Sequence, residues 1–260
     1  MPTTYGKLGC RPPRPERQAR LLRLRNYLNS SLLPAPPPST NHRAGIVWPM
    51  MANDTTGDCT IACVGHMIQE WTTLNGVSLV LTDQQVLATY SALTGYDPRQ
   101  TQPDGSNPTD KGAVITDVLD AWRQSGIQGN QLGAYVSLGV TNHADVIEAV
   151  YLFGSIDCGV NLPAAWQGAD VWDAPSRWHL FHRWAPGSWG GHCVPIVDYD
   201  AQYLYAVSWG QVVPVSYAAW DMYFSEAYAL LDMAWFNGQK VAPNGFDLEA
   251  LTADLQAVTG

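Results

Sequence analysis

The fold is decided by one stretch in the first quarter of the chain, which reads Asn53-Asp54-Thr55-Thr56-Gly57-Asp58-Cys59-Thr60-Ile61-Ala62-Cys63. A polar, glycine-containing turn gives way at Cys59 to an apolar segment with helical spacing, whose buried stripe is Ile61, Val64, Ile68 and Trp71. This spacing predicts a helix over residues 59–75. The dipole at a helix N-terminus favours a thiolate. The stretch therefore predicts a reactive cysteine at the start of a buried helix.

A second stretch far downstream supplies a matching base. It reads Gly190-Gly191-His192-Cys193-Val194 and is followed by Ser208-Trp209-Gly210. His192 begins an apolar segment that reads as a strand, so its imidazole can be aimed across a cleft. A cysteine near a helix start and a histidine far along the chain form the layout of a cysteine nucleophile with a histidine base.

The remaining elements predict an α+β fold, with helices first and an antiparallel sheet second. Thr82 and Gln85 form a capping box that starts a helix ending near Thr94. Further helices are expected over residues 112–125 and 142–153. Strands are expected over residues 193–199, 203–208 and 212–215, followed by a partly helical segment from residue 217.

These motifs resemble those of the papain-like cysteine peptidase superfamily. The run from Gly191 to Val194 is similar to the family's Gly-His-Ala-Val, and Leu81-Thr82-Asp83-Gln84 is similar to its Leu-Ser-Glu-Gln. The resemblance implies a helical half built around the nucleophile helix and a sheet half that carries the base. It also implies that Cys59 attacks, that His192 moves the proton, and that Asn53, six residues before the nucleophile, helps to hold the oxyanion. The run from Asn53 also resembles a poorly characterised papain-like branch found in bacteriophage and actinobacterial sequences.

Two positions depart from the family pattern. Val207 stands where the family has the asparagine that orients the histidine, and a valine side chain cannot accept the imidazole N–H. Ser208 and Asp198 are then the candidates for orienting His192, and Trp209 is a candidate for shielding it. Asp58 stands directly before the cysteine, where a carboxylate would raise the pKa of the thiol if it faced Cys59.

The leading functional prediction is a thiol-dependent hydrolase of peptide or amide bonds that acts through a Cys–His pair and an acyl-enzyme, with a peptide or protein as substrate. The alternative is a catalytically weak or inactive papain-like protein with a structural or binding role, such as a bacteriophage particle component. Val207 and Asp58 favour this alternative.

The first 43 residues predict a basic, proline-rich arm in front of a papain-like domain over residues 44–260. Seven basic residues and one acidic residue give residues 1–25 a net charge of +6. Because the net charge of the whole chain is −9, the remaining residues carry a net charge of −15. A short amphipathic helix is expected over residues 16–33, with a stripe formed by Leu21, Leu24, Leu28 and Leu32. The arm is expected to pack across the body, to act as a pro-segment, or to dock on an acidic protein surface in a homo-oligomer or larger assembly.

Composition limits the other classes. The acidic body argues against a dedicated nucleic-acid binder, and no apolar stretch is long enough for a membrane helix or a secretory signal. Five scattered cysteines predict a reducing compartment such as the cytoplasm, or a virion, and no disulfide framework. Cys63 and His66 follow Cys59 on one helical face, but paired Cys-x-x-Cys spacings are absent, so no metal and no cofactor are expected.

Overall fold

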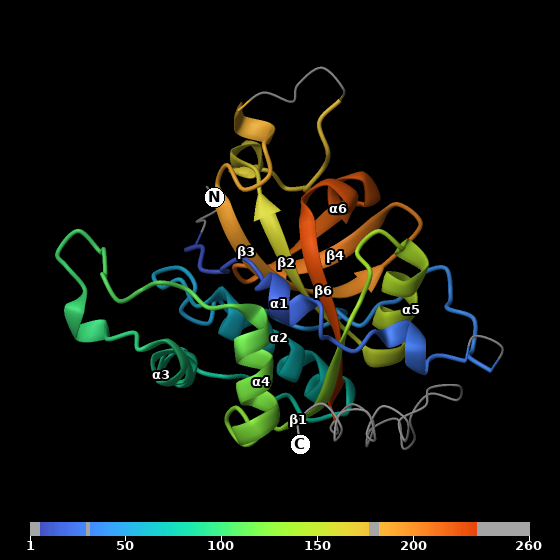
Figure 1. Cartoon of the computed structure of the whole chain (residues 1–260), viewed down its shortest axis with the longest axis horizontal. Coiled ribbons are helices and arrows are strands. Elements are labelled where there is room, and N and C mark those ends of the chain that lie inside the picture. The colour runs from blue at the N-terminus through green and yellow to red at the C-terminus, as the bar shows by residue number, and fades with distance from the viewer. Residues whose placement is uncertain (1–5, 30–31, 177–181, 233–260) are drawn as a thin grey trace.

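Two halves, one helical and one built on a sheet, face each other along the central helix. The computed structural model describes residues 6–29, 32–176 and 182–232. The helical half contains α2 (Cys59–Leu74), α3 (Asp83–Thr94) and α4 (Ile115–Ser125), and Figure 1 shows these helices beside the sheet. This arrangement confirms the predicted α+β class.

The sheet half is a six-stranded antiparallel sheet with the order β1-β6-β2-β3-β4-β5. Its strands are β1 (Leu132–Ser137), β2 (Ile156–Leu162), β3 (Gly190–Tyr199), β4 (Tyr203–Ser208), β5 (Gln211–Ser216) and β6 (Phe224–Asp232). Helices α5 (His143–Phe153) and α6 (Tyr217–Tyr223) pack on it. The strands predicted at β3, β4 and β5 are present, whereas β1 and β6 were not predicted.

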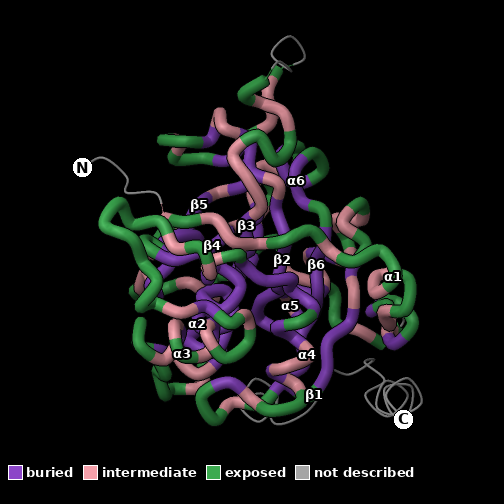
Figure 2. The backbone as a smooth tube through the Cα atoms, turned by 60° about the vertical axis from the view of Figure 1, so that its left-hand side comes forward, coloured by how far each residue is buried: buried purple, intermediate pink, exposed green. Residues whose placement is uncertain are grey.

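Helix α2 is the core of the molecule and packs against β3. Every residue from Cys59 to Trp71 is buried, as the purple trace in Figure 2 shows. Gly65 allows the side chain of Met51 to pack closely on this helix, because a Cβ atom at residue 65 would lie 2.4 Å from Sδ of Met51. The sequence placed the start of this helix correctly at Cys59.

Helix α3 begins as the sequence predicts. The hydroxyl of Thr82 accepts the backbone N–H of Gln85, and the Gln85 side chain accepts the backbone N–H of Thr82 in return. This capping box satisfies two N–H groups that a helix start otherwise leaves unpaired. The helix ends at Gly95, whose left-handed φ of 78° is a conformation that glycine adopts without strain.

The arm does not form the single helix expected over residues 16–33. It has one short turn, α1 (Pro15–Gln18), and a 3₁₀ turn, η1 (Leu24–Tyr27), with extended backbone between them. The extended part pairs with the sheet, since the N–H of Ser137 donates to the carbonyl of Leu22. Three arginines bind acidic residues of the body: Arg14 to Asp117, Arg17 to Asp120 and Arg25 to Asp145. These long-range contacts favour an extended path over a continuous helix.

The proline-rich linker also lies against the sheet half. The hydroxyl of Tyr199 donates to the carbonyl of Pro37 at 3.0 Å. Beyond the prolines, the backbone N–H groups of His42 and Arg43 donate to the carboxylate of Asp198. The linker is therefore fixed in place. No helix within the described ranges is both long and apolar enough to cross a membrane.

Candidate functional site

The thiol of Cys59 lies at the interface between the two halves. Cys59 is the first residue of α2 and is 1% exposed. The backbones of Cys193, the residue next to His192, and of Gly9 in the arm are near enough to its sulfur to lower the pKa of the thiol. The fold thus places the predicted nucleophile beside the strand that carries the predicted base.

Ser208 and Trp209 hold the imidazole of His192. Nε2 of His192 lies 3.0 Å from the hydroxyl of Ser208. Trp209 stacks on the ring, with centroids 4.5 Å apart and an interplanar angle of 22°. Among the described residues, no group bonds to Nδ1 of His192. The tautomer with hydrogen on Nε2, donating to Ser208, leaves a lone pair on Nδ1, which is the state that a general base requires.

The hairpin between β4 and β5 explains how Trp209 reaches this ring. Trp209 and Gly210 form its two-residue turn, and both have positive φ angles, of 47° and 71°. Two positive φ angles are typical of the type I′ turn that joins antiparallel strands. Because Trp209 has a side chain, its conformation costs some strain, which the stacking against His192 offsets in part.

The side-chain amide of Asn53 points toward a peptide carbonyl of the arm. Its Nδ2 donates to the carbonyl oxygen of Lys7 at 3.1 Å and to that of Thr56 at 3.0 Å. Nε1 of Trp209 approaches the same oxygen of Lys7, at 3.4 Å. Asn53 therefore has the reach to donate to a peptide carbonyl at this site.

The arm fills the cleft between the halves from residue 6 to residue 11. On the helical side, the carbonyl of Gly9 accepts the N–H of Ala113 at 2.9 Å. The N–H of Arg11 donates to the carbonyl of Ala113, also at 2.9 Å. On the sheet side, the N–H of Cys10 donates to the carbonyl of Gly191 at 3.2 Å. Backbone bonds to both walls hold this segment in place, with Gly9 against Gly57 in the turn before Cys59.

Glycines on both sides make this close contact possible. A Cβ atom on Gly9 would lie 1.7 Å from the carbonyl oxygen of Gly57, and one on Gly191 would lie 2.3 Å from the carbonyl oxygen of Cys10. This part of the arm was not predicted to belong to the site. The repeated glycines at residues 6, 9, 57, 112, 190 and 191 are the signal that could have indicated it.

The two other positions considered beside His192 serve the fold. Both carboxylate oxygens of Asp198 are bound by the linker, and Arg43 adds an ion pair at 2.7 Å. Asp198 is thus bound to the linker and is not the group at Nε2 of His192. Val207 packs with Trp48 and Val197 in a small separate cluster. Ser208, one residue further, makes the contact that the missing asparagine was expected to make.

The arm sets the electrostatics of the cleft by excluding water. Burial raises the pKa of the Cys59 thiol well above its usual value, and the neighbouring carboxylate of Asp58 raises it further. Burial lowers the pKa of His192 to about 3. Burial also raises the pKa of Asp58 to about 8. The thiol and imidazole are therefore both neutral while the arm is in place.

A further group of side chains includes two cysteines that lie close to Cys59 and His192 in the chain. Cys63, Asp157 and Cys193 bring their sulfur and oxygen atoms together in the core. His66, which the sequence placed on the same face as Cys63, bonds instead to the carbonyl of Pro49 at 2.8 Å. Asp157 was not identified from the sequence, because only the pairing of β2 with β3 brings it to this place.

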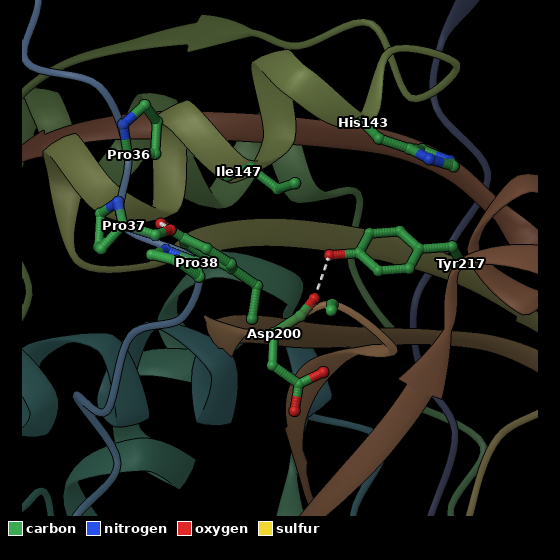
Figure 3. Close-up of a pocket in the computed structure, with 9 residues that line it drawn as sticks. Pro36, Pro37, Pro38, His143, Ile147, Asp200 and Tyr217 are labelled. Carbon is green, nitrogen blue, oxygen red and sulfur yellow. Dashed lines mark hydrogen bonds between the residues drawn. The ribbon is translucent and has the colours of Figure 1, made fainter.

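A pocket of about 420 Å³ lies elsewhere, where the proline linker meets α5 and the turn after β3. Figure 3 shows Pro36, Pro37, His143 and Tyr217 around it, with the Tyr217 hydroxyl donating to the carbonyl of Asp200 at 2.8 Å. None of the predicted site residues lines this pocket. The candidate site is thus the cleft that the arm occupies.

Solved structures share this fold. The sequence itself matches no described protein family and no curated protein. Xylellain, a cysteine protease from Xylella fastidiosa, matches with a TM-score of 0.63 and 13% identity, over 86% of this chain and 96% of that one. ProCathepsin B S9 from Trypanosoma congolense matches with a TM-score of 0.57 and 12% identity, over 86% of each chain.

The cysteine protease and lectin-like domains of Cwp84, a surface layer associated protein of Clostridium difficile, match with a TM-score of 0.52 and 11% identity, over 76% of this chain and 52% of that one. These structures define the class: the chain has the fold of the papain-like cysteine peptidases. The resemblance predicted from the sequence is confirmed at the level of fold, and identities of this size establish nothing finer.

Proposed function

We propose that this protein is a latent thiol hydrolase of peptide or amide bonds, with Cys59 as nucleophile and His192 as base. The observation that carries the proposal is the state of His192. Ser208 occupies Nε2, while Nδ1 has no bonded partner in the described part of the chain. In the tautomer with hydrogen on Nε2, His192 can accept a proton at Nδ1, which no group among the described residues occupies, the sulfur of Cys59 included. The proposal therefore requires the thiol and Nδ1 to approach each other when the cleft opens.

In the proposed reaction, the sulfur of Cys59 attacks the carbonyl carbon of the substrate while Nδ1 of His192 accepts the thiol proton. The amide of Asn53 and the backbone N–H of Cys59 hold the oxyanion. When the tetrahedral intermediate collapses, the C–N bond breaks and His192 protonates the leaving amine. A water molecule, deprotonated by His192, then hydrolyses the thioester and restores the thiol. No cofactor is required.

The arm accounts for latency in this proposal. Gly9 of the arm lies against Gly57, in the turn before Cys59, and Cys59 is only 1% exposed. The arm also occupies the Asn53 amide with the carbonyl of Lys7. A substrate can enter only when residues 6–11 leave the cleft. The rehydrated cleft then lowers the pKa of the thiol and raises that of the imidazole toward their usual values.

A second function is favoured by one observation. The arm buries Cys59 almost completely, at 1% exposure, through backbone bonds to both walls. An arm that covers Cys59 permanently is suited to a non-catalytic structural or binding protein with the same fold. A role in a bacteriophage particle or another assembly stays a prediction from the sequence, as does the location of the protein.

Alkylation by iodoacetamide between pH 5 and pH 9, with each cysteine followed by peptide mapping, distinguishes the two functions. The chain is compared with its Gly9→Ala variant, which is expected to displace the arm, and with Gly9→Ala combined with His192→Ala. A hydrolase should show Cys59 alkylated in Gly9→Ala with an apparent pKa below that of a free thiol, and His192→Ala should raise this pKa. If the displaced-arm variant alkylates Cys59 no faster than a free thiol, with or without His192, the hydrolase proposal is wrong.

A further inference from the structure

A second group of reactive side chains lies beneath the cleft and takes no part in the proposed hydrolysis. Sγ of Cys63 lies 3.3 Å from Oδ1 of Asp157, and Sγ of Cys193 lies 3.0 Å from the same oxygen. The three atoms lie within 4.8 Å of one another. They come from α2, β2 and β3, so three separate elements converge on one point.

This group is an unexpected one for a protein core. Cys63 and Asp157 are each 1% exposed, and Cys193 is 3% exposed. A buried carboxylate is costly unless it is paired, and thiols are weak donors that solvate it poorly. Among the described residues, no lysine, arginine or histidine forms an ion pair with Asp157. One buried carboxylate oxygen bound by two thiols has the chemistry to bind a cation.

We propose that Cys63, Asp157 and Cys193 form a binding site for a zinc ion that links α2 to β2 and β3. Thiolate and carboxylate groups are zinc ligands, and zinc prefers a tetrahedral arrangement. Zn–S and Zn–O bond lengths place sulfur and oxygen ligands about 3.5 Å apart around a tetrahedral ion. The observed separations of 3.3 Å and 3.0 Å require the ligands to move apart by only a few tenths of an ångström.

Binding replaces protons with the metal. The thiols of Cys63 and Cys193 each release a proton and bind as thiolates, and Asp157 binds as the carboxylate, so no oxidant or reductant is involved. Three protein ligands leave the fourth tetrahedral position to a water molecule, as in other zinc sites with three protein ligands. Because the group is buried, zinc is expected to bind as the chain folds.

A disulfide between Cys63 and Cys193 is the competing use of these residues, and the structure favours it less. Cys63 and Cys193 are both free cysteines in this structure, and each thiol donates to the same oxygen of Asp157. A disulfide would also remove both thiol donors from the carboxylate of Asp157. The buried acid would then lose much of its hydrogen bonding.

The position of the site gives zinc a defined role. Cys63 lies one helical turn after Cys59, and Cys193 directly follows His192. A zinc ion here would fix the distance between the helix that carries the proposed nucleophile and the strand that carries the proposed base. The site does not depend on hydrolase activity, because its ligands are separate from Cys59, His192 and Asn53.

The test is to produce the full chain in zinc-supplemented medium and to measure bound metal by mass spectrometry. We expect one zinc ion per chain, and in cobalt-substituted protein the absorption of a tetrahedral thiolate site. Cys63→Ser, Cys193→Ser and Asp157→Asn should each weaken zinc binding at least tenfold in competition with a chelator. Cys158→Ser is the matched control, since Cys158 is also buried on β2 but bonds to the carbonyl of Ile156; it should retain the metal.

Refolding keeps the test decisive if the ligand variants fold poorly. Unfolded, reduced wild-type chain is refolded with zinc, with magnesium or with a chelator, and thermal unfolding is then measured. Zinc alone should raise the unfolding temperature. The proposal is overturned if wild-type chain binds no zinc under either protocol, if Cys63→Ser binds zinc as tightly as the control, or if the intact mass shows a Cys63–Cys193 disulfide in place of metal.

Discussion

The hydroxyl of Ser208 lies 3.0 Å from Nε2 of His192. This serine therefore positions the imidazole through one ring nitrogen, while the other, Nδ1, has no hydrogen-bond partner among the described residues. A hydroxyl both donates and accepts, so it can accept the Nε2 hydrogen, but it does so less rigidly than an amide carbonyl. The arrangement therefore predicts a base that is oriented but weaker than one fixed by asparagine.

Replacing Ser208 tests this positioning role. Ser208→Ala removes the acceptor at Nε2, so the tautomer with its lone pair on Nδ1 is no longer favoured. In the Gly9→Ala background, we expect the rate of Cys59 alkylation at neutral pH to fall roughly tenfold, which is less than the 10²–10⁴-fold of general acid–base catalysis because Ser208 only positions the base. Ser208→Thr keeps the hydroxyl and should restore most of the rate. A purely structural role would instead lower the unfolding temperature of both variants without moving the pH profile of alkylation.

Displacing the arm should activate the thiol. Gly9→Ala places a methyl group 1.7 Å from the carbonyl oxygen of Gly57, so the backbone must shift here, and we expect residues 6–11 to be displaced from the cleft. We expect Cys59 alkylation to rise at least tenfold over wild type, because exposure to water removes the burial that raises the pKa of the thiol.

Gly139→Ala is the matched control for this change, since a Cβ atom there would meet no atom within 4 Å. It should leave the alkylation rate at the wild-type value. An equal rise in both variants would show that the effect is general loosening of the fold. No rise in Gly9→Ala would show that the arm does not limit access to Cys59.

The buried acid before the nucleophile should make stability depend on pH. Burial raises the pKa of Asp58 to about 8, whereas in the unfolded chain it titrates near 4. Between these values the folded state keeps a proton that the unfolded state loses. Stability attributable to Asp58 is therefore highest below pH 4 and falls as the pH rises toward 8.

Asp58→Asn removes this dependence, and it breaks no cap hydrogen bond, because the Asp58 side chain makes none at the start of α2. The free energy of unfolding of the variant should exceed that of wild type. This difference should grow as the pH rises from 4 to 8, to roughly a few kcal/mol. Denaturant melts across this range measure the difference. Asp54→Asn, at an exposed neighbouring position, is the control and should show a constant offset. A difference for Asp58→Asn that does not change with pH would contradict the assigned shift.

Local signals in the sequence predicted the elements that depend on neighbours in the chain. The helix start at Cys59 and the capping box at Thr82 each require only a few consecutive residues, and both are present. The helix predicted from residue 112 begins three residues later, at Ile115, because Ala113 takes part in the backbone pairing with the arm.

Long-range contacts set the features that the sequence did not show. The path of the arm depends on ion pairs between residues about a hundred positions apart, such as Arg17 with Asp120. The helical spacing of the arm leucines alone therefore predicted the wrong structure. In the same way, Asp157 joins Cys63 and Cys193 only through strand pairing, which has no local signature.

The contact to His192 from β4 comes from Ser208, one residue after the position where the family has its asparagine. Side chains alternate across a strand, so neighbouring residues face opposite sides of the sheet. In β4, Val207 faces Trp48 and Val197, while Ser208 faces His192. The absence of asparagine at residue 207 therefore says little about the orientation of His192.

This alternation makes a prediction about restoring the family's asparagine. Val207→Asn would place a polar amide in the apolar cluster with Trp48 and Val197, not beside the imidazole. A buried amide without partners costs about 1–3 kcal/mol. We expect denaturant unfolding to show a loss of this size and Cys59 alkylation in the Gly9→Ala background to stay unchanged. Val207→Ala separates the loss of packing from the cost of the amide, and faster alkylation in Val207→Asn alone would show that residue 207 can reach His192 after all.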